Sequence, residues 1–127
     1  MQKFILIMIC ALIIFFCIAC SNTSVPNKRY KKISNYVLEN IEEFTIENEI
    51  EFFDYETTGL IIGGVYYGYY YTANNEIVVP NFYGGNNLGK RYEADGGTYF
   101  GKPNTGTDWC FIKKITDNWY YYELHWG

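Results

Sequence analysis

Histidine is almost missing from this chain of 127 residues, and its scarcity excludes the commonest catalytic and metal sites. His125, the one histidine, has no cysteine or second histidine at a spacing that would complete a zinc site. The serines near the start of the chain, Ser21, Ser24 and Ser34, do not lie in the sharp turn that presents a serine nucleophile. The sequence therefore predicts a protein that is not an enzyme and that uses no metal and no cofactor.

Lysine and arginine are missing from a long internal stretch. Residues 33–89 contain no basic side chain but nine carboxylates: Glu39, Glu42, Glu43, Glu47, Glu49, Glu51, Asp54, Glu56 and Glu76. This block argues against binding to nucleic acid and favours either simple solubility or a basic protein partner. Calcium loops need carboxylates gathered on a turn with a glycine, whereas most of these residues fall on a predicted helix and strand.

A hydroxyl residue is missing where the one phosphate-loop pattern would need it. Residues 84–90, GGNNLGK, fit the first seven positions of that loop, but Arg91 stands where a serine or threonine would hold magnesium. No strand–loop–helix pattern surrounds the segment either. We interpret it as a loop rich in glycine and asparagine.

The most apolar segment lies at the N-terminus. It begins after Lys3, extends from Phe4 to Ala19 and is followed by Cys20, which is typical of a secretory signal peptide. The residues Cys17-Ile18-Ala19-Cys20 resemble the lipobox of bacterial lipoproteins, although that family usually has an aliphatic residue where Cys17 stands.

This resemblance implies three segments: a signal peptide at 1–19, a tether at 20–29 lipidated on Cys20 with palmitate, and a single domain at 30–127. It also implies a membrane-anchored protein of the bacterial cell envelope, facing the periplasm or attached to the outer membrane. A cleaved soluble protein and a retained membrane anchor remain alternatives. The apolar run is slightly short for a spanning helix, which needs about 20 residues.

Cysteine becomes scarce once this segment is set aside. Cys10 and Cys17 would leave with the signal peptide and Cys20 would carry lipid, so Cys110 has no partner for a disulfide. Cys110 lies in an apolar, strand-like run and is predicted to be a buried thiol. An ordinary apolar core must then hold the domain together.

The remaining chain reads as one helix followed by strands. Apolar residues recur at steps of three and four at Tyr30, Ile33, Val37, Ile41 and Phe44, which predicts an amphipathic helix. Strands are expected near 50–56, 64–72, 76–79, 97–101, 107–115 and 118–126, the last two joined as a hairpin at Asp117-Asn118. The predicted fold is α+β: one N-terminal amphipathic helix packed on an antiparallel meander sheet of about five strands.

Tyrosine is abundant, with 14 residues beside 3 tryptophans. Because strand side chains alternate, Tyr67, Tyr69 and Tyr71 share one face, and Tyr66 and Tyr70 share the other. Which row the helix covers stays open. Packing in the core explains part of these tyrosines and tryptophans, and the number beyond what a core needs indicates an interface. The candidate partner-binding residues are Tyr67, Tyr69, Tyr71, Trp119, Tyr121, Glu47, Glu49, Asp54 and Glu56.

These features favour a lipoprotein that binds a protein partner. In its size, lipobox, acidity and the runs GGVYYGYYY and DNWYYYELHW, the chain resembles the small lipidated immunity proteins that neutralise bacterial toxins. The resemblance implies that the partner is a basic toxin, or another envelope protein, and that binding blocks its active surface. A carbohydrate- or peptidoglycan-binding module and a general structural lipoprotein of the envelope remain alternatives.

Overall fold

The computed structural model describes residues 25–60, 63–80, 88–106 and 108–126. The chain divides into two compact units, Met1–Lys32 and Ile33–Gly127, and the sheet belongs to the second unit. Helix α2 (Val25–Asn40) begins in the first unit and ends in the second. The predicted signal peptide at 1–19 and the predicted lipidation of Cys20 lie outside the described residues.

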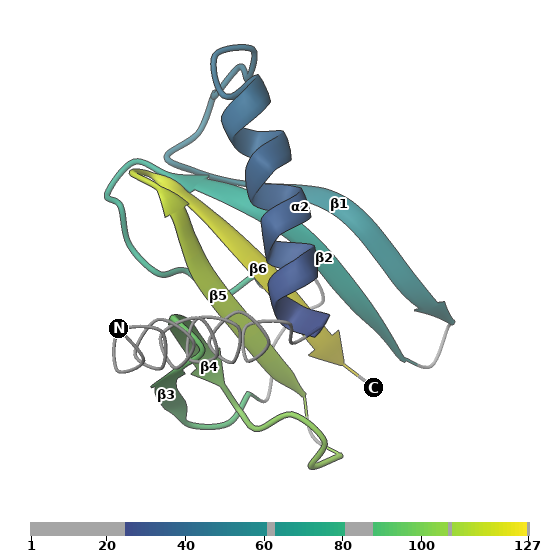
Figure 1. Cartoon of the computed structure of the whole chain (residues 1–127). Coiled ribbons are helices and arrows are strands. Elements are labelled where there is room, and N and C mark those ends of the chain that lie inside the picture. Colours follow the sequence, from purple (N-terminus) through teal and green to yellow (C-terminus); the bar gives the residue numbers. More distant parts are fainter. Residues whose placement is uncertain (1–24, 61–62, 81–87, 107, 127) are drawn as a thin grey trace, which may run out of the picture. The chain divides into compact units, whose positions relative to one another are not determined.

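Six strands of the second unit form one antiparallel sheet. They are β1 (Ile50–Leu60), β2 (Gly63–Thr72), β3 (Arg91–Ala94), β4 (Gly97–Phe100), β5 (Trp109–Thr116) and β6 (Trp119–Trp126). Their order in the sheet is β1-β2-β6-β5-β4-β3, which Figure 1 shows with β6 between β2 and β5. The strand formed by the end of the sequence is therefore a central strand.

The predicted fold class is wrong. The protein is mostly β, with one short helix beside a six-stranded antiparallel sheet, instead of a helix packed on a meander of about five strands. A meander would place β3 beside β2, but β2 pairs with β6 along most of its length. Aromatic pairs favour this register, because Tyr70 stacks on Tyr120, directly opposite, with ring centroids 5.2 Å apart.

Two short segments explain the rest of the difference. Residues 76–79 were predicted as a strand but leave the sheet after Asn75, whose φ of 53° turns the chain. The backbone N–H of Val78 then donates to the hydroxyl of Tyr70 at 3.0 Å, so the segment lies against a face of the sheet. Strand β3 was not predicted, because its sequence RYEA carries two charges in four residues.

The predicted hairpin at Asp117-Asn118 is confirmed by the antiparallel pairing of β5 with β6. Asn118 adopts a φ of 70°, and its side-chain amide donates to the carbonyl oxygens of Thr72 and Ala73 at 2.9 and 3.1 Å. Its backbone N–H donates to Oδ1 of Asn75 at 2.9 Å. These bonds fasten the turn after β2 to the turn between β5 and β6.

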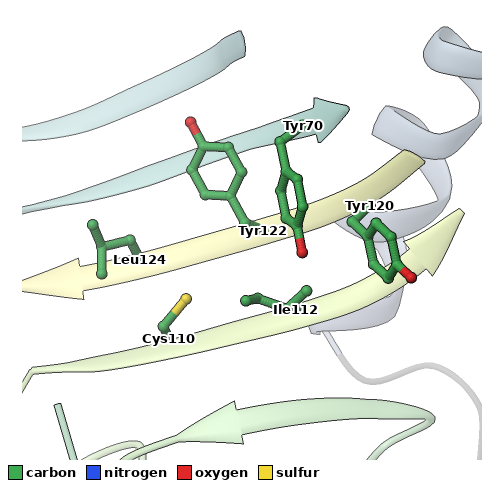
Figure 2. Packing of buried hydrophobic residues seen from close by; sticks show 6 residues of the cluster. All are labelled: Tyr70, Cys110, Ile112, Tyr120, Tyr122 and Leu124. Atoms are coloured by element: carbon green, nitrogen blue, oxygen red, sulfur yellow. The ribbon is translucent and has the colours of Figure 1, made fainter. Parts of the chain in front are cut away.

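Both faces of the sheet carry a core. One face holds a cluster formed by Tyr70, Cys110, Ile112, Tyr120, Tyr122 and Leu124, drawn in Figure 2, with Ile77, Val78 and Val79 packed against it. Cys110 is free and buried, as predicted. On the other face, Phe44 after the helix lies 5.4 Å from Tyr69 and 5.0 Å from Trp119 between ring centroids. Tyr36 of α2 also packs on Tyr69, so the helix side of the sheet is the face of Tyr69.

Candidate functional site

The predicted aromatic site residues lie in the interior. Tyr67, Tyr69, Trp119 and Tyr121 are between 0% and 7% exposed, and Tyr71 is half-buried. The two tyrosine rows of β2 are thus both covered over most of their length, since Tyr70 on the opposite face is also fully buried. Sequence alone could not reveal this, because two rows of the same amino acid look equally suited to a core or to an interface.

The predicted acidic site residues lie together along one edge of the sheet. Glu47 and Glu49, in the segment before β1, are exposed, as is Asp54 within β1, whereas Glu56 is half-buried. Glu51, which was not among the candidate partner-binding residues predicted from the sequence, lies on the same strand and is half-buried. Its carboxylate accepts a hydrogen bond from the backbone N–H of Glu47 at 3.2 Å, which holds the two residues beside each other.

A β-bulge distributes these carboxylates over both faces of the edge. The register of β1 against β2 shifts between Asp54 and Glu56, where Asp54 pairs with Gly68 and Glu56 with Tyr67. Residues two apart normally share a face of a strand, but the extra residue of a bulge places them on opposite faces. Glu56 thereby shares the helix side with Glu51, and Asp54 lies on the other side.

Two exposed ion pairs of the described residues lie away from these carboxylates. They join Arg91 to Glu93 and Lys114 to Asp117, and both are distant from β1 in the sheet order. The carboxylate of Asp54 instead accepts a hydrogen bond from the hydroxyl of Thr57 at 2.5 Å. We name the set Glu47, Glu49, Glu51, Asp54 and Glu56 the acidic edge.

A second polar group lies inside the structure on β6. The carboxylate of Glu123, 6% exposed, accepts a hydrogen bond from the Tyr121 hydroxyl at 2.8 Å and contacts Nε2 of His125 at 2.5 Å. The His125 ring stacks on Trp109 at 3.7 Å with an angle of 11°. Both oxygens of Glu123 are thus occupied, which fits a structural role for the pair.

The described residues contain no group of three or more side chains suited to hold a metal ion. Ser34 is buried on α2, while Ser21, Ser24 and most of the predicted glycine–asparagine loop lie outside the described residues. Among the described helices, none is long and apolar enough to cross a membrane.

Comparison with known proteins gives no relative. No family model, no curated protein and no solved structure matches this chain. The function proposed below therefore depends on the sequence and the geometry of this molecule alone.

Proposed function

We propose that this protein is a non-enzymatic lipoprotein of the bacterial cell envelope that binds a basic protein partner through the acidic edge. We further propose that the partner is a toxin, which the protein neutralises as an immunity protein. The observation that supports partner binding is the acidic edge itself, whose exposed carboxylates lie within residues 33–89, a stretch that contains no lysine or arginine.

Charge of one sign at an edge has two effects on binding. It raises the rate at which a basic partner associates, because the field draws opposite charge toward it, and it disfavours acidic competitors. Both effects weaken as salt concentration rises, since the screening length is about 8 Å at physiological ionic strength. A lipid on Cys20 would hold this surface at the membrane, where an envelope-acting toxin arrives.

The partner proposal is tested by expressing the protein together with the product of the neighbouring gene. We expect a complex that co-purifies and cells that survive expression of the neighbour in the envelope. The double variant Glu49→Gln/Asp54→Asn should weaken the complex about tenfold, equivalent to about 1.4 kcal/mol. The control Glu93→Gln/Asp117→Asn removes the same charge elsewhere and should bind normally. Absence of both complex and protection would overturn the proposal.

The anchor is tested separately by labelled palmitate. We expect incorporation into the native protein and none into Cys20→Ala. An unlabelled native protein would exclude lipidation but would leave the partner proposal standing, because the acidic edge does not depend on the anchor.

Wall binding is the weaker alternative. A sugar platform needs exposed rings, and the rings best suited by sequence, including Tyr67, Tyr69 and Tyr121, are buried. We therefore expect no retention of the protein on isolated cell wall.

A further inference from the structure

Strand β1 forms a long edge of the sheet. It contains 11 residues, whereas β3 at the opposite edge contains four. Among the strands that the structure describes, only β2 pairs with β1. A long unpaired strand edge is a template to which another chain can add a strand.

The pairing of β2 determines which way the backbone of β1 points. The backbone N–H of Thr72 donates to the carbonyl of Asn118 at 2.9 Å, so at Thr72 the backbone of β2 is directed toward the turn before β6. Backbone groups of a strand alternate in direction along the chain. Gly68 and Tyr66 are therefore also directed toward β6, and the residues of β1 opposite them are in non-hydrogen-bonded pairs.

Five residues of β1 thus direct their backbone N–H and C=O away from the sheet. Ile50 pairs with Thr72, Phe52 with Tyr70, Asp54 with Gly68, Thr57 with Tyr66 and Gly59 with Gly64. The side chains of Ile50, Asp54 and Thr57 are all exposed, so a partner strand can approach them. The outer backbone of β1 is accessible at the start of the strand and on both sides of the bulge.

The charges beside this backbone favour a basic occupant. Glu51 and Glu56 flank it on the helix side of the sheet, and Asp54 flanks it on the other. A second copy pairing through β1 would bring these carboxylates against their equivalents, which is unfavourable for like charges on opposed strands. A strand carrying lysine or arginine at alternate positions would place its cations against them.

We propose that β1 accepts a basic, extended segment of a protein partner as an added strand of the sheet. This inference rests on the proposed function and specifies how the acidic edge recognises its partner: hydrogen bonds to the backbone of β1 align the segment, and the acidic edge selects its charge.

The test uses the full chain and a synthetic peptide of alternating lysine and threonine. Peptide binding should slow hydrogen exchange at the amides of Ile50, Asp54 and Thr57, which point outward. It should leave Glu51 and Phe53 little changed, because these amides already face β2. This alternation is expected of strand addition and not of loose electrostatic attachment.

The matched control peptide has the same sequence and charge but carries N-methyl groups on alternate residues. We expect the N-methylated peptide to bind at least about tenfold more weakly, because it cannot complete the hydrogen-bond ladder. In the protein, Thr57→Pro removes an outward N–H and should weaken the unmodified peptide, whereas Thr57→Ala keeps the N–H and should not.

Several results would overturn the inference. Equal affinity for the two peptides would mean attraction by charge alone, and failure of the unmodified peptide to bind would exclude addition of a basic strand. Protection of these three amides that appears without peptide and grows with protein concentration would assign the edge to a second copy. Each of these results leaves the proposed function intact if co-expression with the neighbouring gene product still gives protection.

Discussion

At the scale of single residues, Gly68 is the position where the sheet tolerates least change. A Cβ atom there would lie 2.1 Å from the carbonyl oxygen of Phe53 and 2.6 Å from the hydroxyl oxygen of Tyr122. Gly68 faces Asp54 at the bulge, so the absence of a side chain allows the backbone of β1 to approach β2 closely. The glycine that interrupts the tyrosine run is therefore what permits the bulge.

We predict that Gly68→Ala lowers the free energy of unfolding by about 1–3 kcal/mol, because the added methyl group overpacks this contact. Urea unfolding followed by circular dichroism measures the change. The double variant Gly68→Ala/Tyr122→Phe should not recover the loss, since the clash with the Phe53 carbonyl remains. Recovery would instead identify the Tyr122 hydroxyl as the obstacle.

The buried phenols and the thiol make stability sensitive to alkaline pH. Burial raises the pKa of Tyr70 and Tyr122 above the ordinary value, and burial likewise raises the pKa of the Cys110 thiol. In the unfolded chain these groups ionise near about pH 10 for tyrosine and about pH 8.5 for cysteine. Above those values the unfolded state releases protons that the folded state retains, so the folded state loses stability.

We therefore predict full stability at neutral pH and a progressive loss once the pH exceeds about 8.5, steeper above about 10. Urea unfolding at a series of pH values, with tyrosinate absorbance recorded in parallel, measures both processes. In Tyr70→Phe the decline above pH 10 should be shallower, because one buried phenol is removed. A stability that is flat to about pH 11 would contradict the assignment of these phenols to the core.

At the scale of elements, the junction between the two turns links the end of β2 to the start of β6. The side-chain amide of Asn118 donates to the carbonyl oxygens of Thr72 and Ala73, which are distant in sequence. Tyr120 adds a hydrogen bond from its hydroxyl to the carbonyl of Asn75 at 2.9 Å. The two turns therefore place the start of β6 beside the end of β2.

We predict that Asn118→Gly destabilises the protein by about 1–2 kcal/mol, because the side-chain hydrogen bonds are lost while the positive φ stays accessible. Asn118→Ala should cost about 1 kcal/mol more, since alanine is strained in that conformation. The difference between the two variants in urea unfolding isolates the backbone contribution. Equal losses would show that conformation contributes little.

The accuracy of sequence-based reasoning also differs between elements. The hairpin at Asp117-Asn118 is local and carries its own turn residues, so the sequence predicts it well. The pairing of β2 with β6 joins residues such as Tyr70 and Tyr120, and no local signal distinguishes it from a meander. Residues 76–79 have a strand-like composition, but β6 occupies the adjacent position in the sheet, and they cover a face instead.

The residues of the candidate site also differ in how well the sequence predicts their positions. The carboxylates of the acidic edge could be predicted, because charged side chains seldom enter a core without a partner. The burial of Tyr69 and Tyr121 could not, because tyrosine fits both interiors and interfaces. The bulge that separates Asp54 from Glu56 depends on Gly68 across the ladder and is not visible in the sequence of β1.

At the scale of the whole molecule, protection should follow the position of each strand in the sheet and not its position in the chain. Strands β2 and β6 are central, and the first six residues of β6 are all buried. Strand β3 is a four-residue edge whose residues alternate between exposed and half-buried.

We predict that backbone amides of β2 and β6 exchange hydrogen most slowly and those of the edge strands β1 and β3 more quickly, because central strands open only with the whole sheet. Hydrogen exchange followed by mass spectrometry resolves these segments. Fast exchange in β6 together with slow exchange in β3 would contradict the strand order.

The central place of β6 also determines when this protein can fold. During synthesis the β1–β2 hairpin is completed first, but one side of β2 lacks its neighbour until Trp119–Trp126, the last strand described, has been made. Chains emerge from the ribosome at about 5–20 residues per second, so the half-built sheet must wait several seconds. Throughout that interval the edge of β2 that β6 covers in the folded protein stays unpaired.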